Sequence, residues 1–198
     1  TTAAVAPAAP GAGTEPGGAL QRIVVTGQAD QKRSDEGYRA SGSDTATGLG
    51  LTLRETPQAI TVVTREQMDD FKLHSVNDVL AAAPGVIVEK VETDRTYYTA
   101  RGFDVTNFQL DGIGMPFTNG AQWGDVDAWV YERVDVLRGA NGLGSGTGYP
   151  SATVNYVRKK PTADFQAAAG LSLGSWNDVR LQGDVSGALR SEEHTSEL

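Results

Sequence analysis

The chain has 198 residues, no cysteine and a formal net charge of −8, and 39% of its residues are hydrophobic. The lack of cysteine excludes a disulfide framework and thiolate chemistry, and the negative charge argues against a nucleic-acid surface. No run of about 18 apolar residues occurs, so no transmembrane helix is predicted, although alternating membrane strands would escape that test.

Residues 1–50 are predicted to be a disordered N-terminal segment. The first 20 residues are largely Ala, Pro, Gly and Thr, and residues 28–48 are polar and charged. One β-prone island, IVVTG at 23–27, interrupts this segment. It can be an edge strand of the domain, or a segment that adds as a strand to the sheet of a partner. The pattern alone leaves both interpretations open.

The folded part is predicted to begin near Leu51, with a first strand at 59–63. Two helices follow, each opened by a hydroxyl residue with a capping partner three positions later, Thr64 with Gln67 and Ser75 with Asp78. The apolar residues expected on their buried faces are Met68, Phe71, Val76, Val79, Leu80 and Ala83. Pro84-Gly85 ends the second helix.

Strands and polar loops alternate over the next stretch. The predicted strands are 86–91, 107–110, 133–138 and 153–158, and the last two flank a glycine-rich loop. Two loops, 92–98 and 115–124, are rich in aromatic residues. Asp111-Gly112 predicts a hairpin turn, and Asp125 is expected to cap a short helix that runs through Trp129.

Two stretches of about ten residues, 165–173 and 179–189, alternate apolar with polar or small residues. This pattern is typical of transmembrane barrel strands, and it also fits an ordinary hairpin with one face on a core. Residues 190–198 (RSEEHTSEL) break the alternation. They resemble the translation of a common sequencing-adapter oligonucleotide, so we expect a non-native tail there.

No catalytic motif is present in the sequence. It contains no HExxH, no paired Cys/His ligands and no GxSxG, and His74 stands alone once the tail is set aside. The glycine-rich loop runs into a strand, whereas a phosphate-binding P-loop opens a helix with Gly-Lys-Ser/Thr. We therefore predict that the chain is not an enzyme.

Several motifs, in this order, resemble the plug domain of TonB-dependent outer-membrane receptors: LRETPQAITVVTREQMDD, SVNDVLAAAPGV, ARGF, QLDGI and YERVDVLRGANGLGSGTGYPSATVNYVRKKP. Within that family the sequence of these motifs is most similar to siderophore receptors of the ferric coprogen, rhodotorulic acid and pyoverdine group. Many relatives have RGP and later PGG, where this chain has RGA at 138–140 and PSA at 150–152. That departure favours a hydroxamate-type ligand.

The resemblance implies an α+β fold: a plug domain over 51–161, with a small mixed β-sheet and short helices. The first hairpin of a truncated transmembrane β-barrel follows at 162–189. It also implies a cell outer-membrane location in a Gram-negative bacterium, with the plug and N-terminus facing the periplasm and lipid around the full-length protein. Iron enters only as the ferric siderophore, no cofactor is implied, and a monomer that does not bind nucleic acid is expected.

The resemblance further implies which residues meet each partner. The island becomes the TonB box that binds TonB, working with ExbB and ExbD: Ile23, Val24, Val25, Thr26 and Gly27. The aromatic loops would supply the siderophore contacts: Arg95, Tyr97, Tyr98, Phe117 and Trp123. Arg101 and Arg138 match arginines that pair with glutamates of the barrel wall. The alternatives are a TonB-dependent receptor for a sugar or cobalamin, and a soluble ligand-binding α+β domain.

Overall fold

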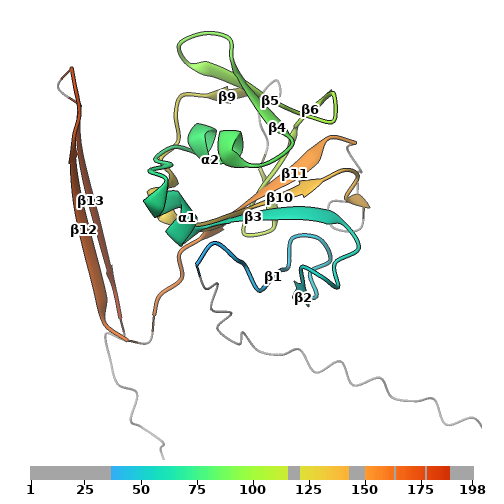
Figure 1. Ribbon diagram of the computed structural model, residues 1–198, viewed down its shortest axis with the longest axis horizontal. Helices are drawn as coiled ribbons and strands as arrows, with labels where there is room; N and C mark the ends of the chain where they lie inside the picture. The colour runs from blue at the N-terminus through green and yellow to red at the C-terminus, as the bar shows by residue number, and fades with distance from the viewer. Residues whose placement is uncertain (1–36, 116–120, 143–149, 163, 177, 188–198) are drawn as a thin grey trace, which may run out of the picture. The chain divides into compact units, whose positions relative to one another are not determined.

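The computed structural model describes residues 37–115, 121–142, 150–162, 164–176 and 178–187 (Figure 1). Its elements, in chain order, are β1 (Gly42–Ser43), β2 (Leu51–Thr52), β3 (Ala59–Thr64), α1 (Arg65–Asp70), α2 (Val76–Ala82), β4 (Val86–Lys90), β5 (Arg95–Ala100), β6 (Phe103–Asp104), β7 (Asn107–Leu110), β8 (Ile113–Met115), β9 (Ala121–Trp123), the 3-10 helix η2 (Ala128–Val130), β10 (Tyr131–Arg138), β11 (Ala152–Arg158), β12 (Gln166–Leu173) and β13 (Val179–Ser186). Among these, no helix has the length and apolar character needed to cross a lipid bilayer.

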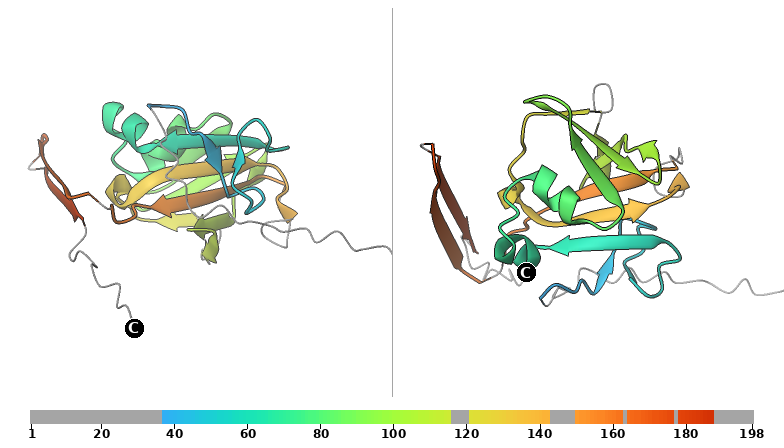
Figure 2. Two further views of the ribbon diagram at one scale, coloured as in Figure 1. Left: turned by 90° about the horizontal axis from the view of Figure 1, so that it is seen from below. Right: turned by 45° about the horizontal axis from the view of Figure 1, so that its top comes forward.

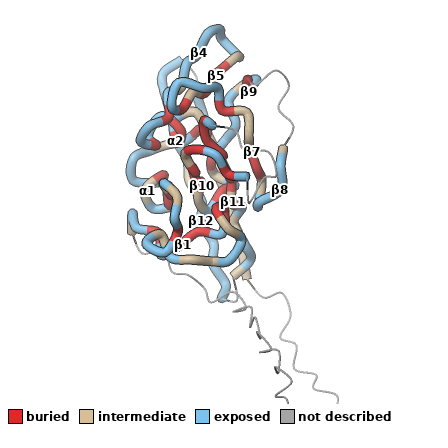
Figure 3. Tube along the Cα trace, turned by 90° about the vertical axis from the view of Figure 1, so that its right-hand side faces the viewer, coloured by how far each residue is buried: buried red, intermediate tan, exposed pale blue. Residues whose placement is uncertain are grey.

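A mixed five-stranded sheet forms the central layer, with the strand order β3-β10-β11-β7-β8. Its neighbours pair antiparallel, except that β11 and β7 run parallel. β10 and β11 have buried residues on both faces, and Figure 3 shows these buried stretches along both strands. Such strands need cover from both sides. The mixed sheet and short helices confirm the predicted α+β class.

Helices α1 and α2 and a second sheet lie on one side of the central sheet (Figure 1 and Figure 2). The second sheet has the order β4-β5-β6, with β9 paired to β5. Between the layers, Met68, Val79, Leu80, Phe108 and Val134 are each at most 1% exposed. Burying a side chain of this size contributes roughly 1.5–3 kcal/mol, so this apolar layer is the main source of the domain's stability.

The two helices begin where the capping signals predicted. The Thr64 hydroxyl accepts a hydrogen bond from the backbone N–H of Gln67 at 3.3 Å. Ser75 and Asp78 form a complete capping box, in which each side chain accepts from the backbone N–H of the other residue. Short helices depend on such caps, because most of their backbone donors have no partner within the helix.

Two helix predictions were wrong in detail. Phe71 is 61% exposed, because it follows the last residue of α1. Its ring packs on Tyr38, with ring centroids 5.7 Å apart. The cap of η2 is Asp127, whose carboxylate accepts from the backbone N–H of Trp129 at 2.7 Å, whereas Asp125 lies two residues earlier. In both cases the predicted residue lies just outside the element.

Two tight turns connect strand pairs through residues with positive φ. Asp111 (φ 50°) and Gly112 (φ 82°) join β7 to β8, which confirms the predicted hairpin. Arg101 (φ 54°) and Gly102 (φ 80°) join β5 to β6 in the same way. Positive φ at both central positions is the type I′ geometry that suits strand twist. The loop predicted over 92–98 is shorter in the structure, since β5 begins at Arg95.

The folded part begins before Leu51. Residues 37–50 belong to the domain: Ala40 is 5% exposed, and Ser43 and Ala46 are 0% exposed. β1 pairs antiparallel with β2, which fixes this segment to the chain that follows it. The disorder prediction is therefore wrong for these residues, because small and hydroxyl side chains can be buried without giving an apolar signal.

β12 and β13 form a separate antiparallel pair with one apolar face. Leu171 lies opposite Leu181, and Leu173 opposite Val179, and all four are at least 65% exposed. The two predicted strands are present as β12 and β13, which end at Leu173 and Ser186, and residues 188 and 189 of the prediction lie outside the described part of the chain.

Candidate functional site

A cation and two aromatic rings meet on the second sheet, where β5 and β9 pair. Arg95 lies opposite Trp123 in the strand register, and its Cζ atom is 5.7 Å from the centroid of that ring. The same atom is 6.0 Å from the ring of Tyr97. Glu92 forms an ion pair with the guanidinium from the preceding turn. Three of the five predicted ligand residues therefore lie together.

This cluster offers a surface for an anionic, partly apolar ligand. Trp123 is 59% exposed, and the Arg95 side chain is 30% exposed. A guanidinium can donate paired, charge-assisted hydrogen bonds to oxygen anions. Aromatic faces beside it can cover the apolar part of the same ligand, which is how small-molecule sites combine orientation with burial.

Tyr98 does not belong to this surface, and its assignment as a ligand contact is corrected. It is 0% exposed, since neighbouring residues of a strand point to opposite faces and Tyr97 takes the outer one. Its hydroxyl lies 2.5 Å from Asn77 Oδ1 and 2.7 Å from Gln122 Oε1. Burial raises the pKa of the Tyr98 hydroxyl, which stays protonated as a donor inside the domain.

Two sets of predicted residues lie outside the described part of the chain. They are Phe117 and the TonB-box residues Ile23, Val24, Val25, Thr26 and Gly27. Their assignments stay predictions.

Two arginines converge at the end of β10, although 37 positions separate them in sequence. Arg101 occupies the β5–β6 turn, and a Cβ atom at Gly139 would lie only 2.7 Å from its Nη1 atom. Arg138 packs on Gly85, where a Cβ atom would lie 3.2 Å from Nη1. Both glycines also have positive φ, 101° and 80°. The glycines therefore provide the room in which the two guanidiniums lie.

Within the residues that the structure describes, neither of these guanidiniums forms a salt bridge. The only polar contact of Arg138 among them is a long one, 3.3 Å from Nη2 to the Thr61 hydroxyl. Arg138 is half-buried, and a guanidinium in that position is costly to leave without an anionic partner, whereas Arg101 is exposed to solvent. The geometry thus suits carboxylates supplied from elsewhere.

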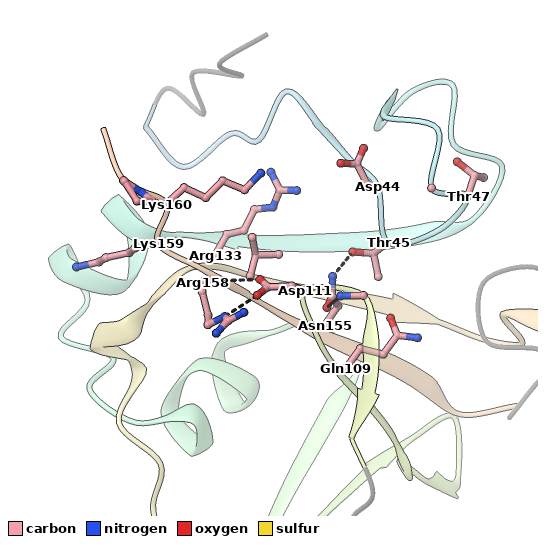
Figure 4. Close-up of a pocket in the computed structure, with 14 residues that line it drawn as sticks. Asp44, Thr45, Thr47, Gln109, Asp111, Arg133, Asn155, Arg158, Lys159 and Lys160 are labelled. Atoms are coloured by element: carbon pink, nitrogen blue, oxygen red, sulfur yellow. Dashed lines mark hydrogen bonds and ion pairs between the residues drawn. The ribbon is translucent and has the colours of Figure 1, made fainter. Parts of the chain in front are cut away.

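A hollow of about 820 Å³ lies on the face of the central sheet opposite the helices (Figure 4). Thr45, Gln109 and Asn155 line one part of it, and Asp111 and Arg158 form an ion pair at its edge, 2.5 Å apart. Burial opposes ionisation of Asp111, but the backbone N–H and guanidinium of Arg158 outweigh it and hold the pKa of Asp111 below its usual value. The sequence patterns did not reveal this hollow, since its residues come from four separate segments.

The family is decided by a match to the model of the TonB-dependent receptor plug domain, which covers residues 52–153. The chain belongs to this plug-domain family. The match includes both helices, the second sheet and the strands of the central sheet up to β10, and it ends within β11.

Several siderophore receptors are similar to this plug domain. The ferripyoverdine receptor of Pseudomonas aeruginosa is 46% identical over 171 residues, which are 84% of this chain and 21% of that protein. The ferrioxamine receptor of Yersinia enterocolitica is 33% identical over 164 residues, 78% of this chain and 23% of that protein. The chain thus spans about a fifth of the curated relatives that it matches.

Solved structures of siderophore receptors are similar to this chain as well. The crystal structure of the P. aeruginosa outer-membrane ferripyoverdine receptor, bound to ferripyoverdine, matches with a TM-score of 0.75 and 48% identity, over 80% of this chain and 22% of that one. The alcaligin outer-membrane receptor FauA of Bordetella pertussis matches with a TM-score of 0.72 and 42% identity, over 82% of this chain and 29% of that one.

These relatives confirm the predicted class of protein. All are named as receptors, in agreement with the prediction that the plug domain does not belong to an enzyme. The titles of two of the solved structures place those receptors in the outer membrane, which supports the predicted location. The resemblance to siderophore receptors is confirmed. Its narrower part, the coprogen and rhodotorulic acid group, stays a prediction.

Proposed function

We propose that this plug domain closes the barrel of an outer-membrane receptor that takes up a ferric siderophore, with a hydroxamate-type chelate as the ligand. The exposed cluster of Arg95, Tyr97 and Trp123 carries this proposal. The names of the relatives support it, since they refer to ferripyoverdine, ferrioxamine and alcaligin. Iron would arrive as cargo inside the chelate, so no covalent chemistry is needed.

In this proposal the ligand binds where cation and aromatic rings meet. The guanidinium of Arg95 would donate hydrogen bonds to the oxygen atoms of the chelate, in exchange for part of its contact with Glu92. The rings of Tyr97 and Trp123 would cover the apolar backbone of the ligand. Phe117, which lies in the same predicted loop as Trp123, is proposed as a further contact.

The energy for transport would come through TonB and its partners ExbB and ExbD. The island at 23–27 is proposed as the TonB box, which pairs with TonB by strand addition. Residues 162–189 are proposed as the first barrel hairpin, and their exposed apolar face supports a position against lipid. A monomer without a cofactor is sufficient for this function.

Arg101 and Arg138 are proposed to tie the plug to the barrel. Carboxylates of barrel residues would pair with the two guanidiniums, which lack acidic partners in the described residues. In a full-length receptor, Arg138→Ala should raise hydrogen exchange across the plug while the barrel stays protected. Unchanged plug exchange would refute this role.

The ligand proposal is tested with the full-length receptor that contains this chain. Tryptophan fluorescence titrations with ferripyoverdine and ferrioxamine, and with cobalamin as the competing ligand class, should show binding of a ferric chelate only. Arg95→Ala should weaken that binding at least tenfold, because one charge-assisted contact is worth roughly 1.5–3 kcal/mol. Lys90→Ala is the matched control, because this cation on the neighbouring strand β4 pairs with Thr96, whose side chain points to the face opposite Arg95 and Tyr97. Equal effects of the two changes, or binding of cobalamin alone, would refute the proposal.

A further inference from the structure

The turn between β7 and β8 contains the only Asp-Gly pair of the sequence, Asp111-Gly112. Glycine has no β-carbon to shield its backbone nitrogen. In such a pair this nitrogen can attack the side-chain carboxyl carbon of the aspartate. A new N–Cγ bond then replaces the Cγ–OH bond, and the amide proton leaves with the hydroxyl group as water. Hydrolysis of the resulting succinimide takes one water back and gives either aspartate or isoaspartate.

The attacking nitrogen is engaged in a hydrogen bond in this fold. The backbone N–H of Gly112 donates to Asn155 Oδ1 on β11 at 2.9 Å. Asn155 is 5% exposed, and its side-chain amide donates to the Thr45 hydroxyl at 2.9 Å, which fixes the orientation of the acceptor oxygen. Attack by the nitrogen requires the loss of its proton, so it would leave a buried amide oxygen without its donor.

The carboxyl group that would be attacked is engaged as well. The backbone N–H of Arg158 donates to one oxygen of Asp111 at 2.9 Å, and its Nε atom donates to the other at 2.5 Å (Figure 4). Burial raises the pKa of Asp111, but these donors outweigh burial and lower it below the usual value. An ionised carboxylate is a poor target for the attack, because it has no hydroxyl group to release.

Isomerisation at this position would disturb the edge of the central sheet. In isoaspartate the backbone runs through the side-chain carboxyl group, so the turn gains one methylene. The two-residue turn sets the register in which Leu110 lies opposite Ile113. β8 has only three residues and lies at the edge of the sheet, so it has few other contacts to keep that register.

We propose that Asp111 is a site of isoaspartate formation that the folded domain suppresses through Asn155 and Arg158, each of which engages one of the two reacting groups. The Asp111 side chain is 33% exposed, so water reaches the site. The proposal concerns the covalent lifetime of the domain and does not depend on its ligand or on transport.

Ageing of the folded 198-residue chain at neutral pH tests this. Asn155→Ala should raise the rate of isoaspartate formation at Asp111 about fivefold, the factor that one lost hydrogen bond supplies, and Arg158→Gln should raise it at least as much. Arg158 is 62% exposed, so its replacement leaves the core intact. Asn107→Ala is the matched control and should leave the rate unchanged, because that amide donates to the Thr153 hydroxyl at 2.9 Å on the same pair of strands.

The product is measured with a protease that cuts before aspartate but not before isoaspartate, and mass spectrometry counts the fraction left uncut at Asp111. Deamidation of Asn119, in a nearby Asn-Gly pair, changes the mass and is counted separately. Leu80→Ala shows whether unfolding is the route, because it destabilises the core and leaves the contacts of the turn in place. An unchanged rate in either folded variant, or an equal rise in Leu80→Ala, would overturn the proposal.

Discussion

The buried hydroxyl of Tyr98 provides a direct test of the division between core and ligand surface. Tyr98→Phe keeps the ring and its edge contact with Phe108, whose centroid lies 5.6 Å away, and removes only the hydroxyl. Asn77 and Gln122 then lose their contact at 2.5 and 2.7 Å. A buried polar group without a partner costs about 1–3 kcal/mol. We expect the free energy of unfolding to fall by about 1–2 kcal/mol, since the amide of Gln122 can reorient in part.

Tyr97→Phe is the matched control for this change. It removes the same hydroxyl from the next residue of β5, where the side chain is only half-buried and makes no hydrogen bond within the described residues. Urea denaturation of the chain, followed by tryptophan fluorescence, should separate the two variants by at least about 1 kcal/mol. If both variants unfold at the same urea concentration as the unaltered chain, Tyr98 is not a structural hydroxyl and its removal from the ligand set is unjustified.

Three further changes probe other parts of the domain. Gly139→Ala should cost about 1–3 kcal/mol, since φ is 101° there, whereas Gly114→Ala, with open space around it and no positive φ, should change stability by less than about 0.5 kcal/mol in the same denaturation assay. Leu80→Ala should lower the melting temperature strongly, because a fully buried leucine is worth about 2–5 kcal/mol. The pKa of Asp111 is lower in the folded state than its unfolded value of about 3.9, so its pairing with Arg158 stabilises above that pH and is lost as pH falls further. Asp111→Asn should therefore reduce the loss of stability between pH 5 and pH 3, measured by urea midpoints.

Local signals predicted most of the elements correctly. The capping pairs at Thr64 and Ser75 located both helices, and Asp111-Gly112 located a hairpin. Such signals act over three or four residues, so they depend little on the rest of the fold. Arg101-Gly102 was missed as a turn because arginine rarely takes positive φ, and here a glycine follows it in a type I′ turn.

Contacts between segments far apart in the chain could not be predicted from local sequence patterns. In an alternating strand a charged residue between Val134 and Val136 is expected to face solvent, yet Asp135 is fully buried. Only the hydroxyls of Ser43 and Thr45, about 90 residues earlier, make that burial possible, since both donate to its carboxylate. In the same way, the convergence of Arg101 with Arg138 depends on the pairing of strands that no local signal specifies.

The two faces of the central sheet are built by different physical means, and this difference bears on how a plug can be both stable and movable. The helix side is apolar, with Val134, Val136 and Val154 fully buried, and such a layer resists partial opening because every residue depends on its neighbours. The opposite side is closed by hydroxyls on a carboxylate, and water can replace those bonds one at a time. The polar side is therefore expected to open at a lower free energy than the apolar layer.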